Sequence, residues 1–252
     1  MNVLLTNDDG IHYPGLWALY RSLRERFSVE VIAPDRERSA VGHAITLHEP
    51  LRASRTIVNG GYEGYAVTGT PADCVKLGVL ELLEQKPDVV VSGINPGANV
   101  GINLNYSGTV AAAKEAAFYG IAAVAVSVDG THTENFDAAA GFVRSLVEKI
   151  VAKGLPNGTF LNVNIPDAAI DRIAGVRISR QGAPLSGDYF ERRLDPRNRV
   201  YYWQGCDTQT FEEDDALDGA ALKRSYISIT PVKVDMTDYE TLRKMESWRF
   251  EL

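Results

Sequence analysis

The sequence has little of several features that would assign it to a particular class of protein. Its 252 residues include only two cysteines, Cys74 and Cys206, too few for a disulfide framework and without the spacing of a structural zinc site. No basic segment or long apolar run precedes the first polar residues. We therefore predict a cytoplasmic protein that does not bind or cross a membrane.

Positive charge is also in the minority. The chain has 26 lysine and arginine residues against 33 aspartate and glutamate residues, which gives a formal net charge of −7. This excess of acid disfavours binding to a nucleic-acid polymer. A small anion is still compatible with it, because a helix N-terminus or a bound cation attracts phosphate on an acidic protein too.

Signature motifs of several common α/β proteins are absent. Neither the G-x-G-x-x-G of nicotinamide-dependent oxidoreductases nor the P-loop G-x-x-x-x-G-K-[ST] is present where it would be needed. The segment at 8–10 is Asp-Asp-Gly, not the D-x-D of haloacid-dehalogenase-type phosphatases. A non-catalytic receiver-like signalling module, which pairs acids to bind magnesium, is the alternative, but its phosphoacceptor aspartate and its lysine are missing.

Short apolar runs alternate with amphipathic stretches through the first two-thirds of the chain. This pattern is typical of βαβ units, and it predicts a Rossmann-like α/β fold with a mainly parallel sheet and helices on both faces. Strands are expected at 3–6, 29–33, 89–92, 122–128 and 160–165, helices at 15–27, 71–84, 109–119 and 136–153, and shorter β-like pieces of an inserted hairpin at 44–51 and 56–67.

Beyond about residue 180 the composition changes. Aromatic residues flank a turn-like segment at 195–198, which predicts a β-hairpin. An acidic run, a strand and a terminal helix are expected after it, at 212–215, 226–230 and 239–248. We accordingly divide the chain into a Rossmann-like domain at 1–180, which carries the candidate site, and a C-terminal extension at 181–252.

Asp8 and Asp9 directly follow the first strand, at the end where open parallel sheets place their ligand sites. Two adjacent carboxylates repel each other, so a partly buried pair favours a bound cation. Asn-Asp-Asp-Gly is equally good turn chemistry. On this feature alone both interpretations stand.

Two further polar loops also begin where strands end. The loop at 35–42 contains Ser39, and the glycine-rich loop at 92–101 contains Asn95. The amide oxygen of Asn95 suits a hard cation such as magnesium or manganese. Each loop has a structural interpretation as well, as a solvated connection or as an asparagine that bonds within its own loop.

Ser107, Gly108 and Thr109 open an alanine-rich helix and offer hydroxyls and backbone donors to a phosphate. The same residues would serve as an ordinary helix cap. Thr70 and Asp73 form a capping-box pattern at the start of another helix, for which we expect a structural role.

These segments are expected to meet at one rim, because the carboxyl ends of parallel strands lie together. Independent turns have no reason to converge in this way. The combined set of two carboxylates, a hydroxyl, an amide oxygen and a hydroxyl-bearing helix start suits one hard divalent cation and a phosphoryl group.

Taken together, the motifs resemble the survival protein E family. The resemblance is carried, in the family's order, by LLTNDDG at 4–10, TGTPADC at 68–74, VSGINPGAN at 91–99, YSGTV at 106–110 and YISITP at 226–231. Several weak motifs that occur together make a specific signal. The acidic segment at 205–218 departs from the family's pattern.

The resemblance implies a metal-dependent nucleotidase that hydrolyses nucleoside 5′- and 3′-monophosphates, and for some members short polyphosphate. It implies one Mg²⁺ or Mn²⁺ per subunit on Asp8, Asp9, Ser39 and Asn95. It also implies C-terminal extensions that are exchanged between subunits of a homodimer or homotetramer.

For the chemistry we expect the phosphate to be bound by Asn95 and by the helix start formed by Ser107, Gly108 and Thr109. Asp8 and Asp9 are the expected catalytic residues. Attack by water with one aspartate as base is the favoured mechanism, and direct attack by an aspartate is the alternative.

Overall fold

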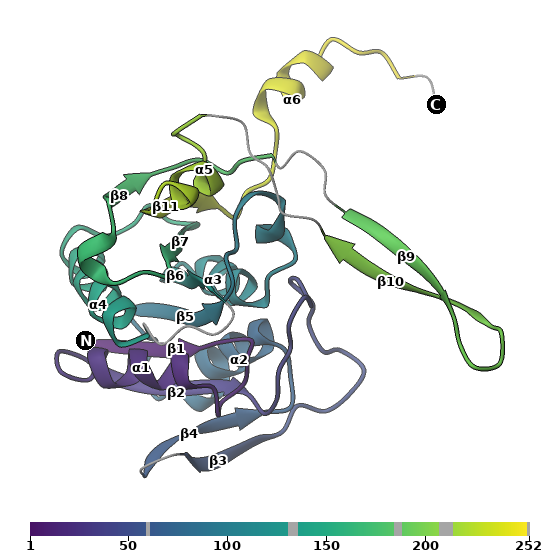
Figure 1. The fold of residues 1–252 in the computed structure, drawn as a ribbon. Coiled ribbons are helices and arrows are strands. Elements are labelled where there is room, and N and C mark those ends of the chain that lie inside the picture. The colour runs from purple at the N-terminus through teal and green to yellow at the C-terminus, as the bar shows by residue number, and fades with distance from the viewer. Residues whose placement is uncertain (59–60, 131–135, 184–187, 207–213, 251–252) are drawn as a thin grey trace.

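The computed structural model describes residues 1–58, 61–130, 136–183, 188–206 and 214–250. Within them the chain forms a mainly parallel sheet of nine strands in the order β3-β4-β2-β1-β5-β6-β7-β11-β8 (Figure 1). The strands are β1 (Asn2–Thr6), β2 (Ser28–Pro34), β3 (Ala53–Val58), β4 (Tyr62–Val67), β5 (Val89–Pro96), β6 (Ala122–Asp129), β7 (Thr159–Pro166), β8 (Gly175–Ile178) and β11 (Tyr226–Lys233).

Helices cover both faces of the sheet. α1 (Pro14–Leu23) packs against α4 (Phe136–Lys153), and α2 (Pro71–Leu77) packs against α3 (Gly108–Phe118). The expected Rossmann-like α/β fold with two helical layers is therefore confirmed.

Side chains of β1 point alternately into the two layers of the core. Val3 and Leu5 belong to the cluster beneath α1 and α4, whereas Leu4 belongs to the cluster beneath α2 and α3. This follows from the two-residue period of a strand. Because Leu4 and Leu5 are fully buried, replacing either by alanine should cost about 2–5 kcal/mol of stability.

The strand order reverses between β1 and β5. From β1 the chain builds outward through β2 and β4, whereas β5 pairs with the other edge of β1 and leads to β6 and β7. Connections that leave adjacent strand ends in opposite directions open a crevice between them. Asp8 follows β1 and Asn95 lies near the end of β5, so both residues are at this crevice.

The prediction of a β-like piece at 44–51 is wrong. The segment forms no strand, because its backbone is bonded to side chains: the Ala44 carbonyl accepts from the Thr70 hydroxyl at 2.8 Å, and the Thr46 N–H donates to Asp73 at 3.1 Å. The neighbouring hairpin β3–β4 is present, and through β4 it extends the main sheet beside β2.

Three helices end earlier than expected, and one of them is the helix expected at 239–248, which ends at Met245. The helix expected at 15–27 ends at Leu23. The helix expected at 71–84 is α-helical only to Leu77 and continues as one π-helical turn, Gly78–Leu82.

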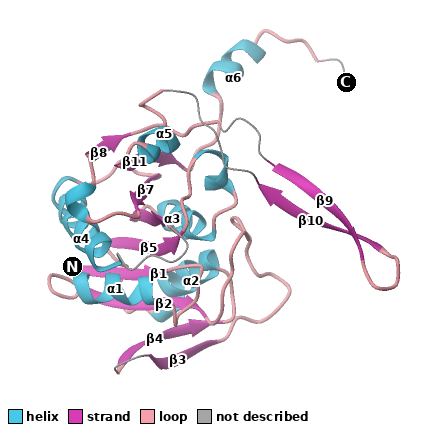
Figure 2. Ribbon diagram, in the orientation of Figure 1, coloured by secondary structure: helices cyan, strands magenta, loops and turns pink. Residues whose placement is uncertain are grey.

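The predicted aromatic hairpin is present and consists of β9 (Asp188–Leu194) and β10 (Val200–Cys206). The carboxylate of Asp195 accepts hydrogen bonds from the backbone in the turn. Figures 1 and 2 show the hairpin projecting from the body of the molecule, as does α6 (Tyr239–Met245) near the C-terminus.

Two short elements near or beyond the predicted boundary at residue 180 escaped the sequence analysis: β8, just before it, and α5 (Asp218–Lys223), in the extension. β11 comes from the predicted extension yet lies inside the main sheet, between β7 and β8.

The acidic run expected at 212–215 falls partly outside the described residues. Its last members, Asp214 and Asp215, form ion pairs with arginines. Among the described helices, none has the length and apolarity needed to cross a membrane.

Candidate metal and phosphate site

Asp8 lies two residues beyond the end of β1 and is only 4% exposed. Its carboxylate accepts a hydrogen bond from the hydroxyl of Thr109, in the first turn of α3. Burial raises the pKa of Asp8, and the hydrogen bond from Thr109 opposes that rise. The helix can come this close because Gly108 has no side chain: a Cβ there would lie 2.8 Å from the Cβ of Asp8. Thr109 and Gly108 thus determine where the Asp8 carboxylate lies.

Asp9 carries a carboxylate oxygen that lacks a hydrogen-bond partner. Its Oδ2 atom is buried, and no donor in the described part of the chain reaches it. Burial, and then the charges of Asp8 and Glu37, raise the pKa of Asp9 to about 8. A buried carboxylate without a donor or a counter-ion is unfavourable when ionised. The position is therefore suited to a cation.

Ser39 comes from the loop after β2, here called the Ser39 loop (35–51). The loop is attached to the end of β1 because the N–H of Arg38 donates to the carbonyl of Asp8 at 2.7 Å. The Ser39 hydroxyl donates to Glu37 at 2.7 Å. Its oxygen lone pairs remain for another partner.

Asn95 is near the end of β5 and half-buried. Its Nδ2 donates to the carbonyl of Gly97 at 2.6 Å, and this orientation leaves the amide oxygen for a cation or a substrate.

An open cavity of about 330 Å³ lies at this end of the sheet. Its lining includes four of the predicted site residues: Asp8, Ser39, Asn95 and Ser107. Three others, Asp9, Gly108 and Thr109, lie outside the lining, and the Thr109 hydroxyl is directed at Asp8.

Ser107 is the N-cap of α3, as the capping interpretation predicts, and its oxygen accepts from the N–H of Val110 at 3.2 Å. It also faces the cavity. The Ser107 hydroxyl hydrogen is therefore placed where an anion could be bound, and the N–H of Gly108 is the neighbouring donor at this helix start. Capping and anion binding are compatible here.

The donor set fits a hard cation. Two carboxylates, a hydroxyl and an amide oxygen are oxygen ligands of the kind that magnesium and manganese take, with water completing the coordination. The fit rests on the buried, unpartnered Oδ2 of Asp9. No group of three or more His, Cys, Asp and Glu side chains within the described residues is arranged for a metal, so a cation here would need Ser39 and Asn95 as well.

Two buried carboxylates on helices hold the Ser39 loop. Asp73 completes the expected capping box of α2, and it also accepts from the backbone and the hydroxyl of Thr46, the latter at 2.6 Å. Glu115 of α3 lies 2.7 Å from Nε2 of His43. Sequence reasoning assigned Asp73 only a capping role and missed Glu115, because their partners are distant in the chain.

Tyr13 and Asn99 were also missed. Burial, and then the charges of Asp9 and Glu37, raise the pKa of Tyr13 to about 12. Asn99 lines the cavity, and its side chain donates to the Ser127 hydroxyl at 2.8 Å. Asn99 lies in the glycine-rich loop singled out from the sequence, which was the available signal. Tyr13 had none.

The chain is similar to known proteins over most of its length. The family model described as Survival protein SurE matches residues 3–187. A protein of Desulfatibacillum aliphaticivorans named 5′-nucleotidase SurE is 57% identical over 100% of this chain and 99% of its own length, and one of the same name from Syntrophobacter fumaroxidans is 49% identical over 98% and 99%. The crystal structure of the SurE protein from Aquifex aeolicus superimposes with a TM-score of 0.86 at 37% identity and covers 98% of both chains.

Proposed function

The chain belongs to the survival protein SurE family, and from this premise we propose that it is a metal-dependent 5′-nucleotidase that cleaves nucleoside monophosphates to nucleoside and phosphate. The names of its relatives support the 5′ activity. Activity on 3′-monophosphates and short polyphosphate belongs to the same proposal and is based on the motif resemblance. The observation that carries the metal dependence is the buried, unpartnered Oδ2 of Asp9 beside a second buried carboxylate.

One Mg²⁺ or Mn²⁺ would be held by the carboxylates of Asp8 and Asp9, the hydroxyl of Ser39 and the amide oxygen of Asn95. When bound, the cation offsets the negative charge of the phosphoryl group and polarises it. Thr109 keeps Asp8 in place through its hydrogen bond.

The phosphoryl group is oriented by the start of α3. Ser107 offers its hydroxyl and Gly108 its backbone N–H. Thr109, whose N–H and hydroxyl are directed at Asp8, and Asn95, whose amide hydrogens donate to its own loop, would act on the phosphate through the metal ligands. Water attacks the phosphorus atom and gives a proton to the carboxylate of Asp8 or Asp9, while the ester P–O bond breaks and the nucleoside leaves with its oxygen, which takes up a proton from that carboxyl group or from solvent. Attack by an aspartate itself is distinguished by trapping a phosphorylated enzyme.

The direct test is phosphate release from nucleoside monophosphates and short polyphosphate with Mg²⁺, Mn²⁺ or a chelator. We expect release that depends on the metal and that falls at least about a hundredfold in Asp8→Asn and Asp9→Asn. Asp171→Asn, at an exposed position remote in sequence from the site, is the matched control. No release with any metal would defeat the proposal and favour the receiver-like module. Full turnover in both variants would refute the assignment of the aspartates.

We also propose that the C-terminal extension, residues 181–252, exchanges its projecting parts, the hairpin β9–β10 and α6, between subunits of a homodimer or homotetramer, while its strand β11 stays in the main sheet of its own chain. The support is the exposure of large aromatic side chains on the projecting hairpin, where Tyr202 and Trp203 are each 59% exposed. Light scattering of the wild type and of a Tyr202→Ser, Trp203→Ser variant tests this, and a monomeric wild type would contradict it. A cytoplasmic location stays a prediction.

A further inference from the structure

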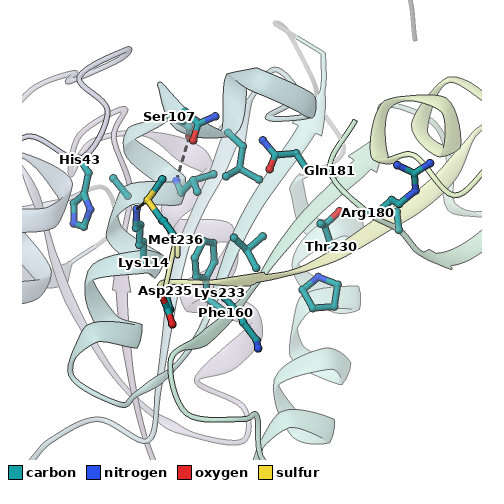
Figure 3. A pocket seen from close by; sticks show the side chains of 17 residues that line it. His43, Ser107, Lys114, Phe160, Arg180, Gln181, Thr230, Lys233, Asp235 and Met236 are labelled. Atoms are coloured by element: carbon teal, nitrogen blue, oxygen red, sulfur yellow. Dashed lines mark hydrogen bonds between the residues drawn. The ribbon is translucent and has the colours of Figure 1, made fainter. Parts of the chain in front are cut away.

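A second cavity lies beside the candidate site and has no part in the chemistry described so far. It measures about 510 Å³ and shares Ser107 with the metal cavity. This size is within the range of roughly 300–1,000 Å³ that is typical of small-molecule sites. Figure 3 shows its lining side chains, with His43 and Lys114 on one side and Gln181 and Arg180 on the other.

One wall of the second cavity is a single face of α3. Its lining residues Ser107, Val110, Ala111 and Lys114 follow the helical spacing of three and four. At about 1.5 Å per residue, Lys114 lies roughly 10 Å along the helix from Ser107. A group attached to a phosphate at the start of α3 would extend along this wall toward Lys114.

The remaining lining combines apolar and hydroxyl groups. Val232 offers aliphatic surface, against which the face of a heterocyclic base can pack; Phe160 lies behind it and is fully buried. Ser179 and Thr230 are 7% and 2% exposed, and their hydroxyls lie 2.9 Å apart. Such groups can exchange hydrogen bonds with a sugar or with the edge of a base.

The second cavity is lined by charges of both signs, with Lys114, Arg180 and Lys233 against Asp235. Arg180 is paired with Asp214 at 2.5 Å, and His43 contacts a buried glutamate. Lys114 has only the thioether of Met236, at 3.5 Å, as hydrogen-bond partner, and no carboxylate in the described structure lies within ion-pair distance of it. Because a thioether is a weak acceptor, the ammonium group of Lys114 is available to a ligand.

We propose that the second cavity binds the nucleoside part of the substrate, and that Lys114 donates hydrogen bonds to acceptors of its sugar or base. This inference rests on the proposed nucleotidase function and adds to it the place where the leaving group is recognised. Lys114 is then a specificity-determining residue that does not touch the phosphate.

The test compares two substrates in the metal-loaded full-length protein. One is a nucleoside 5′-monophosphate, and the other is p-nitrophenyl phosphate, which has neither ribose nor base. In Lys114→Met, which keeps an unbranched side chain without charge, kcat/KM for the nucleotide should fall about tenfold or more, mainly through KM. The value for p-nitrophenyl phosphate should stay within about twofold of the wild type.

Two further variants complete the design. Lys149→Met removes an exposed lysine from α4 on the opposite face of the sheet and should leave both substrates unaffected. Val232→Trp fills the second cavity and should weaken the nucleotide selectively. Calorimetric binding of adenosine to the wild type and to Lys114→Met gives a readout that does not need turnover, and the variant should bind at least about tenfold more weakly.

Equal losses on both substrates, or no loss on either, would overturn the inference while leaving the nucleotidase function intact. So would an equal loss on short polyphosphate and on the nucleotide, which would assign the cavity to an anion. If the wild type hydrolyses neither ester with any metal but binds adenosine in a Lys114-dependent way, the proposed function fails and the nucleoside site stands.

Discussion

Replacing Asp9 by asparagine should make the metal-free protein more stable at high pH. The reason is that the folded protein raises the pKa of Asp9 from 3.8 to about 8, through burial and the neighbouring charges of Asp8 and Glu37. A carboxyl whose pKa is raised on folding contributes most stability below its unfolded pKa. That contribution is lost as the pH rises from about 4 through about 8.

The magnitude follows from the same values. The difference between 3.8 and about 8, at about 1.4 kcal/mol per pH unit, gives an upper bound of about 6 kcal/mol. Because Asp9 is partly exposed, solvent screening reduces this to the order of 2–4 kcal/mol. Asparagine has nearly the same shape and no charge, so it should recover most of this free energy at pH 9 and almost none at pH 4.

The assay is urea unfolding of the wild type and Asp9→Asn between pH 4 and 9, in chelator and in excess Mg²⁺. Titrating groups that do not interact with Asp9 cancel in the difference between the two proteins, whereas Asp8 and Glu37 contribute to it through their charges. Asp171→Asn serves as an exposed control. Added metal should remove the advantage of the variant, since the cation binds the ionised carboxylate. If Asp9→Asn in chelator is less stable than the wild type at pH 9, the ionised Asp9 carboxylate does not destabilise the folded protein and the reasoning is refuted.

Three further predictions concern the surroundings of the carboxylates. Thr109→Val removes the hydroxyl that donates to Asp8 and should raise the pKa of Asp8 further. The acid limb of the pH–rate profile should then move to higher pH. An unchanged profile would show that the Thr109 hydroxyl does not stabilise the ionised Asp8 carboxylate. Gly108→Ala places a Cβ 3.0 Å from Oδ2 of Asp8 and should lower kcat about tenfold or more, whereas wild-type activity would show that the helix start can shift freely. Asp73→Asn weakens the attachment of the Ser39 loop and should cost about 1–3 kcal/mol of stability. It should also weaken metal binding measured by calorimetry. A loss of stability with unchanged metal affinity would show that the Ser39 loop does not position a metal ligand.

Much of the fold follows from local patterns. Apolar runs such as the one in β1 are readable because burial on both faces requires them, and the capping residues Thr70 and Ser107 mark helix starts through their own hydroxyls. The same reasoning predicted a β-like piece at 44–51, and that prediction was wrong. Its strand-like composition was overridden by side chains of α2 that took its backbone hydrogen bonds.

The short elements β8 and α5 show a different limit. Four and six residues carry too little periodicity to stand out from a loop. β8 exists because β11 offers it an edge to pair with, and that edge is known only once the sheet is assembled.

The sequence by itself determined that two carboxylates follow the first strand and that a serine, an asparagine and a helix start belong to the same rim. These are consequences of chain order in a parallel α/β fold. Only the tertiary structure decided that the Thr109 hydroxyl is directed at Asp8, that Asp9 has a buried oxygen without a donor, and that Lys114 and Thr230 line one cavity. Some of these contacts join residues more than a hundred positions apart in the sequence. Their geometry depends on how whole helices and strands pack.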